Sequence, residues 1–342
     1  MTESVYPNSA IMREIADDLR RVRFGGPGAG LARAMMHLTF RYGALDIQDG
    51  DLDVATTPVL ALASARYMAE AIQRKLVTYL KHGGQLFLYG EVPMFDMIGQ
   101  PCRILLHALD LKPIGMRWSD HRYFLSLTAD GWAAPRPELR AGYAQTFATD
   151  GGGVLFRVYG VEEACGFDLD VGKGRAIVMS GEIPTDLSFF SRAFAELGAT
   201  PGLTHDEPRH GIFMSSARTP NGERFIHALN LDGFDKPVHL IDSGEPLFEG
   251  RTVMLRRRDG VMLPVGLDLG DTRVTWSTVE IAERQEDGIT VRLMGGNDAI
   301  LVDTPRIVQP GEGYEITERD DGVLVTFTTR GTGEELVTIR WS

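Results

Sequence analysis

Between Pro58 and Glu91 the pattern of apolar positions changes twice, from continuous to helical and back again. Residues 59–63 form a short apolar run, which is typical of a parallel strand covered on both faces. Over residues 67–81 the apolar positions recur every four residues and predict an amphipathic helix. Gly83 and Gly84 end this helix, because glycine accepts the left-handed conformation that a helix end needs. With the apolar run at 85–89, the pattern predicts a right-handed strand–helix–strand unit.

Similar patterns on both sides of this unit predict an α/β domain over residues 1–203. Helices are expected at residues 10–22, 31–42, 101–109 and 186–197, and short strands at 44–47 and 176–180. The glycine-rich segment 23–30 lacks the GxxxxGK[ST] pattern and follows a helix instead of a strand. It is therefore interpreted as a loop and not as a phosphate site.

Two other parts of the chain have the pattern of antiparallel sheets. Over residues 117–163, aromatic and β-branched residues alternate with turns, which predicts a small β subdomain inserted into the α/β domain. After residue 203 helical periodicity stops, and a Pro-Asn-Gly turn at 220–222 predicts a hairpin. We expect a β-sandwich over residues 204–270, and a second small β domain or a continuation of the sandwich over 271–342.

Composition narrows the class of protein. The 342 residues are 43% hydrophobic and 24% charged, as in ordinary globular proteins, and their number suggests more than one domain. The formal net charge of −12 argues against nucleic acid or an anionic membrane as a partner. The N-terminal residues lack the apolar core of a signal peptide, and no apolar run reaches the roughly 18 residues of a membrane span. The expected location is cytoplasmic.

Cysteine and histidine give no strong catalytic or metal signal. Cys102 and Cys165 do not form a disulfide framework or a CxxC pair. A class I amidotransferase needs a cysteine on the sharp turn after a strand, whereas Glu91 occupies that kind of turn here, and Cys102 is interpreted as a structural thiol. The segment His205–His210 has four possible ligands, but Pro208 interrupts it, so we interpret it as an interdomain linker. No cofactor or metal is predicted.

Two strand ends share a pattern that includes a glutamate. Residues 86–93 (LFLYGEVP) and 177–184 (IVMSGEIP) both contain an apolar strand, then glycine, glutamate, an aliphatic residue and proline. If the strands are parallel neighbours, Glu91 and Glu182 lie together at the carboxyl edge of a sheet, where open α/β folds bind ligands. Such a carboxylate pair can carry out acid–base chemistry. Alternatively, each carboxylate accepts hydrogen bonds within its own turn, which is the commoner role.

Aromatic residues concentrate in the predicted β subdomain. They are Trp118, His121, Tyr123 and Trp132. Exposed aromatic rings can stack on sugar rings, so these four are candidate sugar or interface contacts. The alternative is that they form the core of the small sheet, which is the more usual place for such side chains.

Several segments, taken in order, resemble the part of bacterial β-galactosidase-like glycoside hydrolases, of the family 35 and 42 kind, that follows the catalytic barrel. They are residues 58–109, 166–184, 222–240 and 260–270. The resemblance implies a flavodoxin-like, amidotransferase-like α/β domain that mediates oligomer contacts, followed by β-sandwich domains. It also implies a first apolar strand just before Tyr6, where this chain has only MTESV, so we expect an open sheet edge that a partner could cover.

No run of eight strand–helix repeats precedes Pro58, so the catalytic barrel and its two glutamates have no counterpart in this sequence. The first functional hypothesis is therefore a non-catalytic accessory or oligomerisation portion, which assembles with a barrel-bearing chain or with copies of itself. The alternative is an independent carbohydrate-binding module, or a cryptic hydrolase that uses Glu91 and Glu182. A galactoside or another oligosaccharide is the expected small-molecule ligand.

Overall fold

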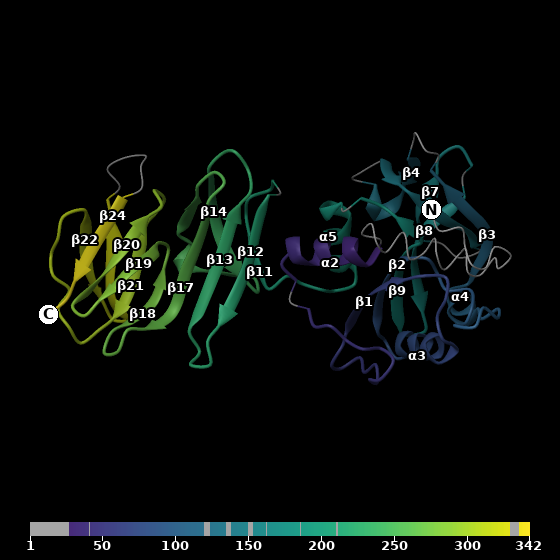
Figure 1. The fold of residues 1–342 in the computed structure, drawn as a ribbon, viewed down its shortest axis with the longest axis horizontal. Coiled ribbons are helices and arrows are strands. Elements are labelled where there is room, and N and C mark those ends of the chain that lie inside the picture. Colours follow the sequence, from purple (N-terminus) through teal and green to yellow (C-terminus); the bar gives the residue numbers. More distant parts are fainter. Residues whose placement is uncertain are drawn as a thin grey trace, which may run out of the picture. The chain divides into compact units, whose positions relative to one another are not determined.

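The computed structural model describes residues 27–40, 42–119, 124–134, 138–149, 153–161, 163–184, 186–209, 211–328 and 335–342 (Figure 1). The helix expected at 10–22 lies outside these residues. Contacts divide the chain into two compact units. The first contains Met1–Met35 and Tyr42–Thr200, and the second contains Met36–Arg41 and Pro201–Ser342.

A ten-stranded sheet forms the centre of the first unit. Three neighbouring strands run parallel, namely β1 (Val59–Ser64), β2 (Gln85–Gly90) and β9 (Gly174–Met179). The other seven pair antiparallel with their neighbours: β3 (Leu111–Trp118), β4 (Leu125–Ala129), β5 (Glu138–Ala141), β6 (Tyr143–Thr149), β7 (Val154–Val158), β8 (Ala164–Val171) and β10 (Gly181–Glu182).

The prediction of a flavodoxin-like, amidotransferase-like α/β domain is therefore wrong. Of the described residues, about 48% lie in strands and about 15% in helices. The strands of the predicted β insert also join the same sheet, through the pairing of β8 with β9. That pairing is antiparallel because a turn of two residues, Gly172 and Lys173, connects the two strands. The sheet is thus mostly antiparallel, with a short parallel part at one end.

The strand–helix–strand unit at Pro58–Glu91 is confirmed. Helix α3 (Glu70–Lys81) connects β1 to β2, which pair in parallel register. The helix ends at the predicted place, and Gly83 has a positive φ of 106° just beyond it. Leu86 and Leu88 of β2 pack in one core with α3. Phe87 and Tyr89 point to the other face of β2, because side chains alternate along a strand.

Helix α5 (Leu187–Glu196) covers that second face of β2. Its phenylalanine rings lie against Phe87, with ring centroids between 5.2 and 6.3 Å apart. Asp186 begins this helix by accepting a hydrogen bond from the backbone N–H of Phe189 at 3.0 Å. Both faces of the parallel strand β2 are thus buried, as its continuous apolar sequence predicts.

The remaining helical segments of the first unit differ partly from the predictions. They are α2 (Pro27–His37), α4 (Ile104–Ala108) and the 3-10 turn η1 (Gly131–Ala133). Helix α2 begins inside the segment interpreted as a loop, with proline as its first residue, where the missing N–H costs nothing. Residues 44–47 do not form the expected strand. Among the described residues, no helix combines the length and the apolar character that crossing a membrane requires.

The second unit is built from strands in three sheets. A seven-stranded sheet contains β12 (Ile212–Arg218), β13 (Arg224–Asn230), β17 (Gly260–Asp268), β18 (Arg273–Ser277), β21 (Ala299–Asp303), β23 (Gly322–Phe327) and β22 (Tyr314–Arg319). A second sheet contains β11 (Leu203–His205), β14 (Lys236–Asp242), β15 (Glu245–Pro246) and β16 (Thr252–Leu255), with the short turn η2 (Phe248–Gly250) between β15 and β16. The third contains β19 (Glu280–Gln285), β20 (Gly288–Leu293) and β24 (Glu335–Arg340). The hairpin predicted at 220–222 is confirmed, since it joins β12 to β13.

Two apolar cores lie in this unit, and the seven-stranded sheet contributes to both. Ala299 and Leu301 of β21 belong to one core, and Ile300 and Val302 of the same strand belong to the other. Because side chains alternate along a strand, the two cores lie on opposite faces of β21. The sheet also continues across residue 270, where the division into two β domains was expected. That division stays a prediction.

Candidate functional site

Glu91 and Glu182 follow the carboxyl ends of neighbouring parallel strands. The pairing of β2 with β9 ends at Tyr89 and Met179, and each glutamate comes two or three residues later. Strands β1, β2 and β9 therefore bring their carboxyl ends to one sheet edge. A role of the two carboxylates as an acid–base pair stays a prediction.

Glu91 is held by an arginine from the preceding strand end. Its side chain is buried, with a residue exposure of 3%, and Oε2 accepts a hydrogen bond from Arg66 Nε at 3.0 Å. The backbone N–H of Glu91 donates to the carbonyl of Ser64 at 2.9 Å. Gly90 turns the chain here with a φ of 115°, a conformation that favours glycine. This arrangement favours a structural role for the Glu91 carboxylate, because removing it would leave the charge of Arg66 without its ion-pair partner.

A cavity of about 350 Å³ opens beside this ion pair. Arg66, Glu91 and Gln145 supply its polar wall, and its apolar wall consists of Met94, Phe95, Pro113, Ile114 and Met116. The Gln145 amide is itself fixed, because it accepts from the N–H of Val92 at 2.7 Å and donates to the Val92 carbonyl at 3.2 Å. The cavity is thus a partly apolar pocket between the loop after β2 and strand β3, with rigid polar groups at one side.

Glu182 belongs to a different row of side chains. It pairs with Tyr143 of β6, which pairs on its other side with Trp118 of β3. Directly paired residues project to the same face of a sheet, and the rings of Trp118 and Tyr143 lie 5.3 Å apart between centroids. Burial raises the pKa of the Tyr89 hydroxyl, and the nearby charge of Glu182 adds a smaller increase. Trp118 is 46% exposed at the outer end of the row.

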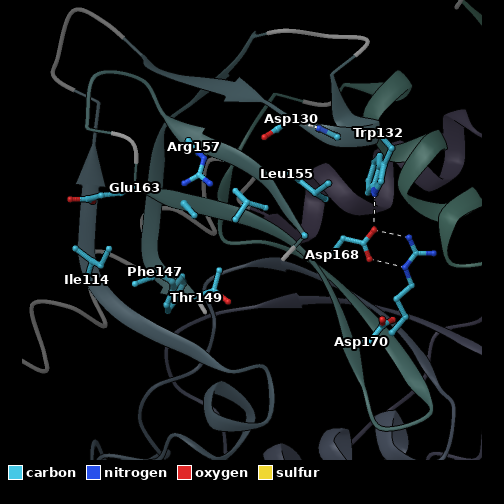
Figure 2. Close-up of a pocket in the computed structure, with 16 residues that line it drawn as sticks. Ile114, Asp130, Trp132, Phe147, Thr149, Leu155, Arg157, Glu163, Asp168 and Asp170 are labelled. Atoms are coloured by element: carbon cyan, nitrogen blue, oxygen red, sulfur yellow. Dashed lines mark hydrogen bonds and ion pairs between the residues drawn. The ribbon is translucent and has the colours of Figure 1, made fainter. Parts of the chain in front are cut away.

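A larger cavity, of about 1000 Å³, is lined by η1 and by parts of β6, β7, β8 and β9 (Figure 2). Trp132 of η1 points its indole N–H at Asp168 of β8 and donates to Oδ2 at 2.7 Å. Arg175 of β9 donates to both oxygens of the same carboxylate, at 2.7 and 2.6 Å. The Trp132 ring also stacks on Phe189 of α5, with an angle of 7° between the ring planes.

The charge of Asp168 depends on these contacts. Burial acts to raise the pKa of its carboxyl group, while the hydrogen bonds from Arg175 and Trp132 and the positive charge of Arg175 lower it. The net result is a pKa below the ordinary value. Asp168 therefore stays ionised at neutral pH and fixes the indole of Trp132 through a charge-assisted hydrogen bond.

The four predicted aromatic contacts do not form one cluster in the described residues. Trp132 lines the larger cavity, and Trp118 packs on Tyr143. His121 and Tyr123 lie outside the described residues. Sequence reasoning missed Arg66, Asp168 and Arg175. Asp168 and Arg175 could have been found, because the Gly-Lys turn at 172–173 is a hairpin signal that brings charges on both sides of it together.

The cysteines and the described part of the histidine-rich linker line neither of the two cavities. Cys102 and Cys165 are both unpaired and buried, and burial raises the pKa of the Cys165 thiol to about 12. Asp206 accepts a hydrogen bond from the His239 ring at 2.6 Å, and Glu207 pairs with Arg209. His210 lies outside the described residues. Within the part of the chain that the structure describes, three or more possible metal-ligating side chains do not gather anywhere.

Comparison with known proteins gives three kinds of match. The family model for the GLMA-like second domain matches residues 12–124. The exo-β-D-glucosaminidase of Thermococcus kodakarensis is 24% identical over 94% of this chain, and the chain spans 41% of that protein's length.

The solved structures match in fold. The β-galactosidase from Rahnella sp. R3 gives a TM-score of 0.56 at 14% identity, over 69% of this chain and 36% of that one. Gan42B, a GH42 β-galactosidase from G. stearothermophilus, gives 0.54 at 15% identity, over 69% of this chain and 35% of that one. At these identities the structural matches show a common fold alone. Together with the family model, they confirm the resemblance seen in the sequence: the chain is similar to the part of β-galactosidase-like glycoside hydrolases that follows the catalytic barrel.

Proposed function

We propose that this chain is a non-catalytic accessory portion of a glycoside hydrolase, which acts by binding a barrel-bearing catalytic chain. The observation that carries the proposal is the unequal coverage of the curated relative. Nearly the whole of this chain aligns with the glucosaminidase, but it accounts for less than half of that protein. The rest of that relative is therefore a different portion of the same protein, and this fold occurs beside it. A chain similar to that other portion is the natural binding partner.

Exposed apolar residues support a protein partner at the smaller cavity. Met97 and Ile98, in the loop after β2, are 69% and 78% exposed. Asp96 holds this loop by accepting from the backbone N–H groups of Ile98 and Gln100, at 3.0 and 2.7 Å. A rigid loop that presents two apolar side chains loses little entropy on binding, which favours an interface contact.

Strand β3 forms the other border of the same cavity. Among the described strands it pairs only with β6, so one of its edges has no strand beside it. Ile114 and Trp118 of β3 are exposed, as is Phe124 after it. An exposed edge strand with apolar side chains is a common place for protein association. We name Met97, Ile98, Ile114 and Trp118 the docking surface.

The test uses the full chain, with a purification tag, in extracts of its source cells. We expect it to elute in a complex that contains a barrel-bearing chain identified by mass spectrometry and that hydrolyses an aryl β-galactoside or β-glucosaminide. Ile98→Asp should release the chain from this complex, because it places a charge in the docking surface. The matched control is Ile307→Asp in the second unit, where the isoleucine is 69% exposed and lies outside the docking surface.

Melting temperatures of both variants equal to that of the wild type would show that neither substitution disturbs the fold. The proposal fails if the wild-type chain elutes at its own mass under all conditions, without any hydrolase. If the complex forms but both Ile98→Asp and Ile307→Asp leave the complex intact, the assignment of the docking surface is wrong.

A further inference from the structure

The larger cavity has features of a ligand site that the assembly proposal does not use. Its volume of about 1000 Å³ lies at the upper end of the range for small-molecule sites. We name it the Trp132 cavity. Figure 2 shows Trp132 at one side of this space, with Asp130 beside it and Asp168 below it.

The aromatic wall of the cavity is rigid before any ligand binds. Phe189 stacks on the Trp132 ring, with centroids 5.9 Å apart, and Asp168 holds the indole N–H. Arg175 in turn fixes Asp168 and donates to Glu196 at 3.1 Å. A ring restrained by stacking and by a hydrogen bond can accept the apolar face of a sugar without losing side-chain freedom.

The charge of the cavity is negative. Four carboxylates line it, against the guanidinium groups of Arg157 and Arg175. Arg175 neutralises Asp168, and Glu163 pairs with Arg117 outside the cavity. The side chains of Asp130 and Asp170 are exposed and line the cavity; Asp130 lies beside Trp132, and Asp170 lies beyond the Asp168–Arg175 pair. Arg157 also lines the cavity and reduces its negative charge, but the carboxylates still outnumber the guanidinium groups. A cation in the cavity would therefore meet two solvent-accessible carboxylates.

We propose that the Trp132 cavity binds a protonated amino sugar, such as a unit of an oligosaccharide of glucosamine. The C–H face of the pyranose ring lies on Trp132, and the ammonium group pairs with Asp170 or Asp130. A sugar supplies the flat apolar face, and the ammonium matches the excess of carboxylates. A neutral sugar lacks this charge complementarity, so we expect it to bind more weakly.

Isothermal titration calorimetry with the full chain tests the proposal, at low ionic strength and neutral pH. The probes are the tetrasaccharide of glucosamine, its fully N-acetylated counterpart, and spermidine. We expect the glucosamine tetrasaccharide to bind at least about fivefold more tightly than either of the others. Trp132→Ala should abolish binding, whereas Trp118→Ala, which removes an exposed tryptophan outside this cavity, should not change it.

A substitution at Asp170 tests the contact between the ammonium group of the sugar and a carboxylate. Asp170→Asn should weaken binding of the glucosamine tetrasaccharide by about two- to fivefold, which is the range for one exposed charge pair. It should leave the N-acetylated probe unchanged. The matched control is Glu70→Gln, which removes an exposed carboxylate from helix α3. Trp132→Phe keeps an aromatic ring if Trp132→Ala fails to fold, and it should retain part of the affinity.

Equal affinity for both tetrasaccharides, or tighter binding of spermidine, overturns the amino-sugar assignment, and no binding of any probe overturns the site. These measurements do not depend on the catalytic partner. A failure here therefore leaves the assembly proposal intact, and a failure of the assembly proposal leaves this one intact.

Discussion

At the scale of single residues, the function of an ionised group depends on which counter-charge folding brings to it. Glu91 and Arg66 are 25 positions apart in sequence, yet the parallel pairing of β1 and β2 places Arg66 Nε 3.0 Å from Glu91 Oε2. The sequence could predict that Glu91 ends a strand at the edge of a sheet, because local periodicity determines that. It could not predict Arg66 as its partner, because that contact depends on the register of two strands.

Replacing the buried carboxylate tests its structural role. Glu91→Gln should reduce the free energy of unfolding by about 1–3 kcal/mol, because Arg66 then keeps its charge without an ionised partner. Urea unfolding monitored by circular dichroism measures the loss. Glu182→Gln is the comparison, since that residue is less buried, and we expect a smaller effect. Equal effects of the two substitutions would contradict the structural importance assigned to the Arg66 pair.

The Asp168 carboxylate predicts a dependence of stability on pH. Its pKa is lowered in the folded protein, so the folded state favours the ionised form. This contribution is complete above the unfolded pKa, near 3.9, and is lost as the pH falls through the lower folded value. Asp168→Asn should therefore lower the melting temperature at pH 7 and reduce its further decrease below about pH 4. A variant whose decrease below pH 4 matches that of the wild type would refute the assignment.

At the scale of elements, one side chain connects helix α3 to the starts of both strands that it joins. The Tyr79 hydroxyl lies 2.9, 3.0 and 3.2 Å from the carbonyl oxygens of Thr57, Pro58 and Gln85. Burial raises the pKa of Tyr79 to about 12, so the hydroxyl keeps its proton and remains a donor. The helix was predictable from its period, whereas this connection needs the folded geometry.

Removing that hydroxyl isolates its contribution. Tyr79→Phe keeps the buried ring and should cost about 1 kcal/mol of unfolding free energy, the usual value for one hydrogen bond. Tyr159→Phe is a suitable control, because Tyr159 is highly exposed. Thermal unfolding of both variants gives the comparison. If Tyr159→Phe costs as much as Tyr79→Phe, the connection at the strand starts is not the cause.

The error in the fold class also arose at the scale of elements. The parallel pairing of β2 with β9 was a hypothesis from two similar strand ends, and it is confirmed. Apolar periodicity could not show what pairs with the far side of β9. The Gly-Lys turn before β9 was the available signal, because so short a connection excludes a parallel crossover. In the second unit the Pro-Asn-Gly turn at 220–222 was a clearer signal, and the hairpin that it predicts is confirmed.

At the scale of the whole molecule, the second unit is organised around one sheet with a core on each face. The sequence indicates short strands and turns in this half, but pairing across large sequence distances decides how they are grouped. Strand β21 pairs with β18 and with β23, and its alternate residues belong to different cores. The two cores should therefore lose their structure together.

Two neighbouring residues of β21 test this coupling. Ile300→Ala and Leu301→Ala each remove a buried side chain, one from each core, and each should cost about 2–5 kcal/mol. In scanning calorimetry, both should lower the temperature of the same transition. If residues 204–270 and 271–342 unfold as separate domains, the two substitutions will shift different transitions.

The shared sheet also limits how this half of the protein can change during evolution. Recombination exchanges segments of a gene most readily where few contacts cross the junction. A junction at residue 270 would separate β17 from β18, which are paired strands, and would leave each parent with an incomplete sheet. Families that contain this architecture should therefore gain or lose the strands after residue 203 as one inherited block, while variation in length accumulates in its turns.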